Sequence, residues 1–292
     1  MADHAAPQHD YHLVNPSPWP LVASIAATVM MFGAVAWMKG LFGLPEGTSW
    51  LFFAGLAGVL YSMVGWWGDV IKESRQGDHT PVVSIGLRYG MVMFIASEVM
   101  FFAAFFWMFF EMALWNEHRV LSNIEEVRTA WAHWPPMGVE TLDPWHLPFL
   151  NTVTLLLSGT TVTWAHHALQ QGDRKSAKLG LALTIVLGVF FTAVQVYEYN
   201  HIIHENLFFS DEAMNSGLYG SIFFMATGFH GFHVLVGSIF LAVCLLRLMA
   251  GQFTPQKHFG FEAAAWYWHF VDVVWLFLFA FIYVAFAGAG HG

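Results

Sequence analysis

The sequence predicts an all-α membrane protein, a polytopic bundle of seven transmembrane helices. Seven stretches of the chain are apolar over about 20 residues, the length of helix that crosses a bilayer core of about 30 Å. Hydrophobic residues make up 57% of the chain and charged residues only 11%. The stretches lack the two-residue alternation of a β-barrel, so helices are the spanning structure that satisfies the backbone here.

The first expected helix follows the turn segment Asn15-Pro16-Ser17-Pro18, and the fourth begins near Pro148. The third, sixth and seventh exceed the minimum length, so they must tilt or project beyond the hydrocarbon. The chain shows no internal repeat and no separate soluble domain, so residues 1–292 are treated as one membrane domain. The expected helices cover residues 19–38, 49–67, 82–115, 148–167, 179–197, 217–249 and 261–286.

Positive charges indicate how the helices are oriented. Connections on the side opposite the N-terminus carry three basic residues, Lys39, Arg119 and Arg128, whereas those on its own side carry seven. Because Lys and Arg favour the cytoplasmic side, we expect the N-terminus in the cytoplasm, or in a mitochondrial matrix, and the C-terminus outside. The seven are Lys72, Arg75, Arg174, Lys175, Lys178, Arg247 and Lys257.

The outer connections are acidic, and they account for most of the net charge of −9. This balance argues against a nucleic-acid partner. Residues 1–18 contain no Lys or Arg and lead into a long apolar run, so we do not expect a cleavable signal peptide. The single Cys244 lies inside the sixth helix, where it is expected to be a small apolar filler. The outer acids are Glu117, Glu125, Glu126, Glu140, Asp143, Glu205, Asp211 and Glu212.

The longest outer connection, residues 116–147, is rich in Trp and Pro. We interpret it as an interfacial aromatic belt stiffened by prolines. A docking surface for an external partner is the alternative.

Sixteen histidines raise the question of a haem or metal site. His230 and His233 lie three residues apart, so a helix puts both imidazoles on one face, a spacing that can chelate. His269 and Asp272 have the same spacing, and with Glu262 they form a polar stripe on the seventh helix. Hydrogen bonding across helices is the other interpretation. We favour it and expect no metal site in this chain.

The charged residues that lie well inside the apolar stretches are Arg88, Glu98, Glu262 and Asp272. Each costs roughly 2.5–3.5 kcal/mol there on insertion scales, so each needs a reason. Arg88 is expected to snorkel toward the basic side. Glu98 lies near the middle of the third helix with no basic residue within a turn, so we expect a buried carboxyl that keeps its proton. It either handles protons or donates a hydrogen bond to another helix, and the sequence leaves both open.

Distinctive motifs run from the N-terminus to the last helix. With them the chain resembles subunit III of the haem–copper cytochrome c oxidases. Seven helices fit the aa3-type members, because quinol-oxidising relatives often have a shorter, five-helix subunit III. The motifs are Asn15-Pro16-Ser17-Pro18-Trp19-Pro20, Gly86-Leu87-Arg88-Tyr89-Gly90-Met91, Ser97-Glu98-Val99, Trp164-Ala165-His166-His167, Gly172-Asp173-Arg174-Lys175, Ala226-Thr227-Gly228-Phe229-His230-Gly231 and, most specific, the run from Gly260 to Trp275.

The resemblance implies a non-catalytic core subunit of a proton-pumping respiratory oxidase, which oxidises cytochrome c and reduces oxygen to water. Haem a, haem a3, CuA and CuB are then expected in subunits I and II, with cytochrome c an indirect partner. The family fold is two bundles, the first two helices and the last five, around a V-shaped cleft filled with phospholipids. The resemblance further implies that the subunit supports proton uptake into subunit I, protects the complex from inactivation during turnover and, as proposed for the family's cleft, aids oxygen entry.

The family's lipid-contact positions map onto Trp67, Lys72, His79, His233 and Arg247. The cations Lys72 and Arg247 end the second and sixth helices, where they can meet lipid phosphates; ordinary charge anchoring is the alternative. At Gly68 mitochondrial members carry a basic residue, which weakens a lipid contact inferred there.

The resemblance places the chain in a bacterial cell membrane, or in the mitochondrial inner membrane. Two alternatives remain, a quinol-oxidising oxidase subunit and a stand-alone seven-helix transporter. A transporter would favour symmetric broken helices, which the sequence does not show.

Overall fold

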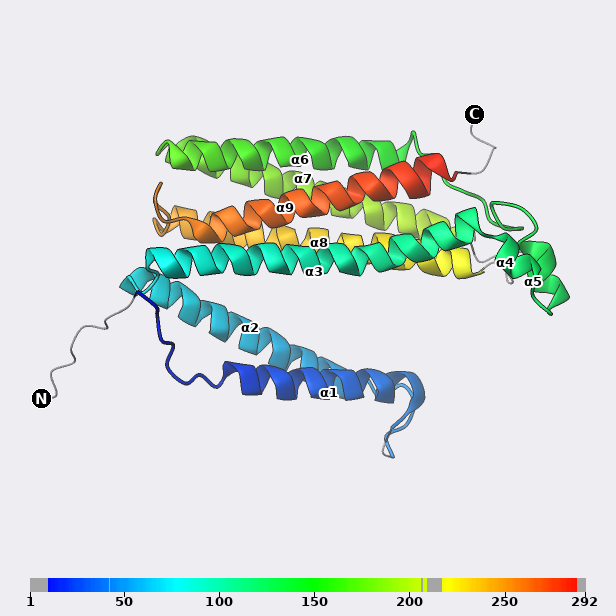
Figure 1. Cartoon of the computed structure of the whole chain (residues 1–292), viewed down its shortest axis with the longest axis horizontal. Coiled ribbons are helices and arrows are strands. Elements are labelled where there is room, and N and C mark those ends of the chain that lie inside the picture. Colours follow the sequence, from blue (N-terminus) through cyan, green and yellow to red (C-terminus); the bar gives the residue numbers. More distant parts are fainter. Residues whose placement is uncertain (1–9, 42, 206, 209–216, 288–292) are drawn as a thin grey trace, which may run out of the picture. The chain divides into compact units, whose positions relative to one another are not determined.

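The computed structural model describes residues 10–41, 43–205, 207–208 and 217–287, and it is almost entirely helical (Figure 1). The described residues contain no β-strand, so the all-α prediction is confirmed. Two of the expected outer acids, Asp211 and Glu212, and residues 1–9 of the N-terminal segment lie outside the described residues. The long helices are α1 (Trp19–Lys39), α2 (Trp50–Gln76), α3 (Pro81–Leu114), α6 (Leu147–Gln170), α7 (Arg174–His204), α8 (Gly217–Met249) and α9 (Phe259–Phe277).

Three shorter elements complete the described chain. The helices α4 (Glu117–Val120) and α5 (Glu125–Ala130) lie between α3 and α6. A π-helical segment, Leu278–Ala285, continues α9.

Within the described residues, six helices are long and apolar enough to cross a membrane: α1, α2, α3, α7, α8, and α9 with its π-helical continuation. The 24-residue α6 has the length but is rich in Thr and Ser. Its hydroxyls bond to carbonyls one turn earlier, as Thr152 Oγ1 does to Pro148 O at 2.8 Å. Such bonds satisfy a hydroxyl inside an apolar layer. We treat α6 as a span on this ground, while the count of seven stays a prediction.

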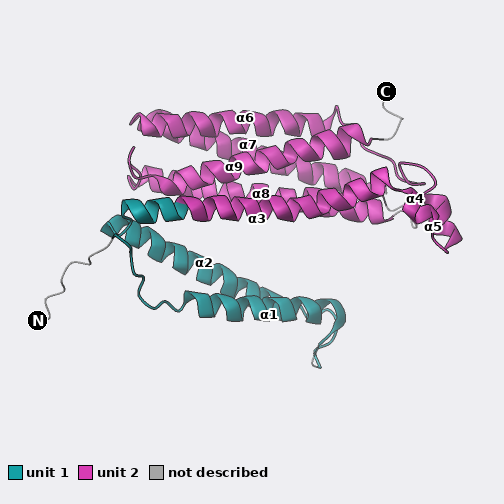
Figure 2. Ribbon diagram, viewed as in Figure 1, with its two compact units in different colours: residues 1–87 teal, residues 88–292 magenta. Residues whose placement is uncertain are grey.

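The chain forms two compact units, residues 1–87 and residues 88–292 (Figure 2). The first unit holds α1, α2 and the first turns of α3, and the second holds the rest. The division after the second helix agrees with the expected grouping into two bundles. The lipid-filled cleft stays a prediction.

In the first unit, α1 and α2 pack with their backbones in contact. A methyl group added at Gly33 would lie 2.3 Å from the Phe52 nitrogen, and one at Gly55 would lie 2.3 Å from the Met30 nitrogen. Small residues are what allow such close helix approach in membranes. Near the other end of the pair, Trp19 Nε1 donates to Asp69 Oδ2 at 2.6 Å.

In the second unit, the core lies between α6, α7, α8 and α9. Two fully buried indoles of α9 anchor it to α6. Trp268 Nε1 donates to Ser158 Oγ at 2.8 Å, and Trp275 Nε1 donates to Thr152 Oγ1 at 2.9 Å. Each indole therefore combines a large apolar contact with a satisfied N–H group.

The helix α3 reaches this core through long side chains. The rings of Phe94 and Tyr267 stack at 6.2 Å between centroids, and those of Phe102 and Phe270 lie 6.1 Å apart. Phe94 and Phe102 lie one turn before and one turn after Glu98, the residue of α3 that contacts α8.

Two helices extend well past their expected ends. The expected second helix ends at Trp67, before the charged stretch, but α2 continues to Gln76. The fifth was expected over residues 179–197, whereas α7 runs from Arg174 to His204. Charged ends need not stop a helix, because they project beyond the apolar layer. The extensions place Lys72 and Glu198 on helices.

Candidate functional site

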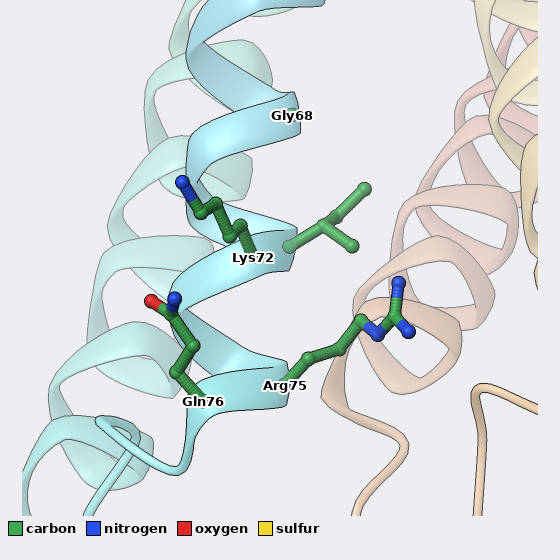
Figure 3. Close-up of a pocket in the computed structure, with 5 residues that line it drawn as sticks. Gly68, Lys72, Arg75 and Gln76 are labelled. Carbon is green, nitrogen blue, oxygen red and sulfur yellow. The ribbon is translucent and has the colours of Figure 1, made fainter.

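The basic end of α2 borders a hollow of about 360 Å³. Its lining comes from one helix and comprises Gly68, Ile71, Lys72, Arg75 and Gln76. In Figure 3, Lys72 and Gln76 extend to one side of α2 and Arg75 to the other. A methyl group at Gly68 would meet no atom within 4 Å, so this position is open.

The two cations of the hollow are exposed at the surface of their unit. Among the described residues, no Asp or Glu forms an ion pair with Lys72 or Arg75. Two positive charges beside an open surface can bind an anionic group such as a phosphate.

Two further expected lipid contacts belong to the same unit. Trp67, which directly precedes Gly68 of the hollow, has 60% of its surface exposed. His79 lies in the turn between α2 and α3, directly after Gly77, whose φ of 97° ends α2 in the left-handed region. Both therefore flank the basic end of α2 in the sequence.

Arg247 lies at the end of α8 in the second unit, where it is half-buried. Its Nε donates to Gln252 Oε1 at 3.1 Å, and its guanidinium lies 4.5 Å from the centre of the Phe253 ring. Arg174 donates to Leu248 O at 2.5 Å and to Phe253 O at 2.8 Å in the same turn. Arg247 thus has a local structural role, unlike Lys72.

The structure pairs Glu98 of α3 with His233 of α8. Glu98 Oε2 and His233 Nε2 lie 2.9 Å apart. The side chain of His233 is 9% exposed and that of Glu98 is 21% exposed. The rings of Phe101 and Phe102 lie 6.0 and 4.9 Å from the imidazole, so the pair has apolar neighbours.

The other nitrogen of His233 decides how many protons this pair holds. His233 Nδ1 lies 2.6 Å from Phe229 O, and a carbonyl oxygen only accepts, so Nδ1 carries a hydrogen. One further proton then lies between Nε2 and Glu98 Oε2. The pair is either a neutral acid with a neutral imidazole or a carboxylate with an imidazolium, and its net charge is zero in both.

Arg88 also meets a carboxylate. Its Nε lies 3.0 and 3.2 Å from the two oxygens of Glu262, and its Nη2 lies 2.9 Å from Oε2. This bidentate geometry gives a strong charge-assisted contact between α3 and α9. The positive charge of Arg88 in α3 and the negative charge of Glu262 in α9 therefore compensate each other.

The polar stripe of α9 divides between two helices. Glu262 meets Arg88 of α3, whereas His269 and Asp272 both face α6 near Gly159, where His269 Nε2 lies 3.1 Å from Thr163 Oγ1. Likewise His230 Nε2 donates to Val271 O at 3.1 Å, away from the contacts of His233. Within the described residues, no three His, Cys, Asp or Glu side chains form a group suited to a metal ion.

The long connection after α3 folds onto the end of the second unit. Trp131 is buried, and Trp134 Nε1 donates to Phe286 O at 2.9 Å. Arg119 donates to Glu111 Oε2 at 2.6 Å and lies 4.8 Å from the ring centre of Trp131. Only Trp145 of these three indoles is strongly exposed, at 60%. Whether the connection docks a partner stays open.

Sequence reasoning missed one buried carboxyl altogether. Glu198 is 1% exposed, but the expected helix ended at Tyr197, so no membrane cost was assigned to it. Extending the helical pattern by one residue would have added it to the intramembrane charges. The partners of Arg88 and Glu98 were missed for another reason, since nothing local marks a contact across 174 or 135 residues.

The comparisons with known proteins agree with the architecture. Residues 9–286 match the family described as cytochrome c oxidase subunit III. Cytochrome c oxidase subunit 3 of Danio rerio is 52% identical over 268 residues, which cover 91% of this chain and 94% of the relative. The same subunit of the alga Prototheca wickerhamii is 50% identical over 269 residues, 92% of this chain and 94% of the relative.

Both relatives match over nearly their full lengths. The family match runs from the segment before α1 to the residue after the π-helical segment. Members of the family are helical membrane proteins. The six apolar helices among the described residues fit a multi-pass protein of this kind. The chain belongs to the cytochrome c oxidase subunit III family.

Proposed function

We propose that this subunit binds phospholipid at the basic end of α2 and thereby supports proton uptake and protects the oxidase from inactivation during turnover. One observation carries the lipid assignment: the hollow in which Lys72 and Arg75 face no acidic partner among the described residues. Each Lys or Arg near an anionic lipid surface contributes about 1 kcal/mol. The open surface at Gly68 leaves room for the headgroup.

As a family member, the chain is a subunit of a membrane-embedded oxidoreductase complex, the respiratory terminal oxidase. The relatives are named as cytochrome c oxidase subunits, so we propose cytochrome c, not quinol, as the electron donor of the complex. Subunits I and II are the proposed partners, and they are the proposed sites of haem a, haem a3, CuA and CuB. In this proposal the chain itself carries no redox centre of the complex.

The proposed location is a bacterial cell membrane, or the mitochondrial inner membrane, with the N-terminus on the cytoplasmic or matrix side. The excess of Lys and Arg at the end of α2, at the start of α7 and around the end of α8 supports this orientation. A reporter enzyme that works only outside the cytoplasm should be active when it is fused to the C-terminus. Activity of a reporter that works only in the cytoplasm would contradict this orientation.

The lipid role is tested by the double variant Lys72→Ala, Arg75→Ala, with Lys175→Ala as a control that removes an exposed cation from the start of α7. We expect normal assembly, haem content and initial oxygen consumption in the double variant. It should retain fewer phospholipids per complex by mass spectrometry, and it should inactivate after fewer turnovers. Normal lipid retention and normal endurance would overturn the proposal. Poor membrane insertion with a normal lifetime would support charge anchoring instead.

Arg247 requires a separate variant because its local contacts hold the end of α8. Arg247→Lys keeps the charge but removes the planar guanidinium, so it tests the stacking contact. Arg247→Ala removes both. If Arg247 also holds a phosphate, only the alanine variant should lose lipid. The lipid contacts of Trp67, His79 and His233 stay predictions.

The partner proposal is tested by mild-detergent purification through a tag on this chain. We expect a haem–copper subunit I to co-elute. Recovery of this chain at full yield without an attached haem protein would contradict the proposal.

A further inference from the structure

Glu198, near the end of α7, lies in a closed polar network that no part of the proposed function uses. Gln195 Nε2 donates to Glu198 Oε1 at 3.1 Å, and the Tyr283 hydroxyl donates to the same oxygen at 2.8 Å. Asn151 Nδ2 donates to Gln195 Oε1 at 3.5 Å. None of these four side chains is more than 5% exposed. The network joins α6, α7 and the π-helical segment.

The two oxygens of the Glu198 carboxyl have different surroundings. Oε1 accepts both hydrogen bonds, whereas Oε2 is buried and has no partner among the described residues. The oxygens of a carboxylate are equivalent, and each needs donors when it is buried. In a carboxylic acid the carbonyl oxygen accepts and the hydroxyl oxygen carries the proton. The observed pattern is that of the acid, with Oε1 as its carbonyl.

The network also contains an unused acceptor. Asn151 Oδ1 is buried and has no partner among the described residues. It belongs to the amide that donates to Gln195, which in turn donates to Glu198. Both buried oxygens without a partner, Glu198 Oε2 and Asn151 Oδ1, are acceptors that lack a donor.

The surroundings of Glu198 supply no compensating cation. In the described part of the chain no Lys, Arg or His forms an ion pair with it. The titratable neighbours are the phenols of Tyr283 and of Tyr199, whose hydroxyl bonds with Thr227 of α8 at 2.6 Å. The helix α6 contributes the neutral Asn151. The helices α8 and α9 contribute Phe223 and Trp275, whose rings lie 5.5 and 5.9 Å from that of Tyr283.

We propose that Glu198 binds a proton and holds it as a neutral carboxylic acid, so that Asn151, Gln195, Glu198 and Tyr283 form a buried proton-binding site. The proton is taken from water and resides on Oε2. Releasing it would leave a buried carboxylate with no cationic partner among the described residues and with one oxygen that accepts no hydrogen bond, a state that proteins avoid. The site shares no residue with the Glu98–His233 pair. It also differs in kind, because Glu98 is partly exposed and shares its proton with an imidazole.

Infrared spectroscopy of the purified oxidase complex tests the proposal. The spectrum at neutral pH should contain a protonated-carboxyl C=O band that shifts on labelling with ¹³C-glutamate. Glu198→Gln should remove this band without loss of assembly, because the amide keeps the carbonyl acceptor and stays neutral. Glu126→Gln, at an exposed acid, should leave the band unchanged. An assembled Glu198→Gln complex that keeps every protonated-carboxyl band would overturn the proposal.

Tyr283→Phe provides a second readout if Glu198→Gln does not assemble. It removes only the hydroxyl that donates to Oε1. The carbonyl then loses one of its two hydrogen bonds, so the band of a neutral Glu198 should move to higher frequency and keep its intensity. An ionised Glu198 would leave the protonated-carboxyl region unchanged in this variant, and the proposal would fail.

Discussion

Glu98 Oε2 and His233 Nε2 lie 2.9 Å apart, and the hydrogen on His233 Nδ1 leaves one proton for that contact. A carboxyl of α3 and an imidazole of α8 are thereby joined into a neutral unit. This relationship explains how an acid is retained in the middle of a membrane helix without a neighbouring base. Its partner comes from another helix.

The first prediction concerns where that proton resides. Because a neutral pair costs less than an ion pair in an apolar setting, we expect the proton on Glu98. A hydrophobic carbodiimide, which reacts with protonated carboxyls, should therefore label Glu98 in the intact complex. It should leave the fully buried Glu198 unlabelled, because the reagent cannot reach it. Mass spectrometry of peptides from the labelled subunit provides the measurement.

His233→Phe serves as the control for this prediction. If Glu98 already carries the proton, the variant should label at a similar rate to the unmodified protein. A large rise in labelling would show that the pair is an imidazolium with a carboxylate, contrary to our expectation.

The second prediction concerns the contact between α1 and α2. Gly33→Ala places a methyl group 2.3 Å from the backbone nitrogen of Phe52, so the helices must separate. Overpacking of this kind costs about 1–3 kcal/mol. When the variant complex is heated, it should lose this subunit at a lower temperature than the unmodified complex does. Gly86→Ala, at a helical position where a methyl group meets no atom within 4 Å, should have little effect. Equal behaviour of the two variants would contradict the close approach of α1 and α2.

The third prediction concerns the indole bonds between α9 and α6. Ser158→Ala removes the acceptor of Trp268 Nε1 and leaves a buried N–H group without a partner. Such a loss costs about 1–3 kcal/mol. The complex should therefore melt at a lower temperature in a thermal scan. Ser221→Ala removes an exposed hydroxyl that bonds only within its own helix, so its melting temperature should be unchanged.

The fourth prediction concerns the start of α7. The carboxylate of Asp173 accepts from the hydroxyl and backbone N–H of Ser176 and from the backbone N–H of Lys175. These bonds hold the pKa of Asp173 below its usual value. A carboxyl with a lowered pKa in the folded state stabilises the fold above its unfolded pKa, about 3.9, and that stabilisation is lost as the pH falls through the folded pKa. Asp173→Ala should thus lower the melting temperature at pH 7, and the difference should shrink below about pH 4.

Asp173→Asn is the matched variant for this measurement. An Asn side chain still caps the helix but does not titrate. Its melting temperature at pH 7 should lie close to that of the unmodified protein, and acid should leave its cap intact. An Asp173→Ala deficit that is constant from pH 7 to pH 3 would exclude the ionised cap as its cause.

Much of the candidate site was accessible from the sequence, but its pairings were not. The resemblance located Lys72, and the absence of a local base made Glu98 conspicuous. The hollow beside Lys72 depends on α2 continuing to Gln76, past the charged residues that suggested an end. The expected fifth helix ended at Tyr197, one residue before Glu198, so the Glu198 network was not predicted from the sequence. Hydropathy finds the apolar centre of a helix well, but it is insensitive to ends that project beyond the membrane.

The sequence by itself determined the all-α membrane class, the apolar helices and the family, because bilayer thickness and backbone hydrogen bonding act on contiguous residues. Only the tertiary structure decided that Arg88 meets Glu262, that Glu98 meets His233 and that Tyr283 donates to Glu198. These partners lie on different helices, and every isolated intramembrane polar group needs one. Which partner it finds depends on the rotation and spacing of packed helices, and these arise from the whole bundle and not from any local segment.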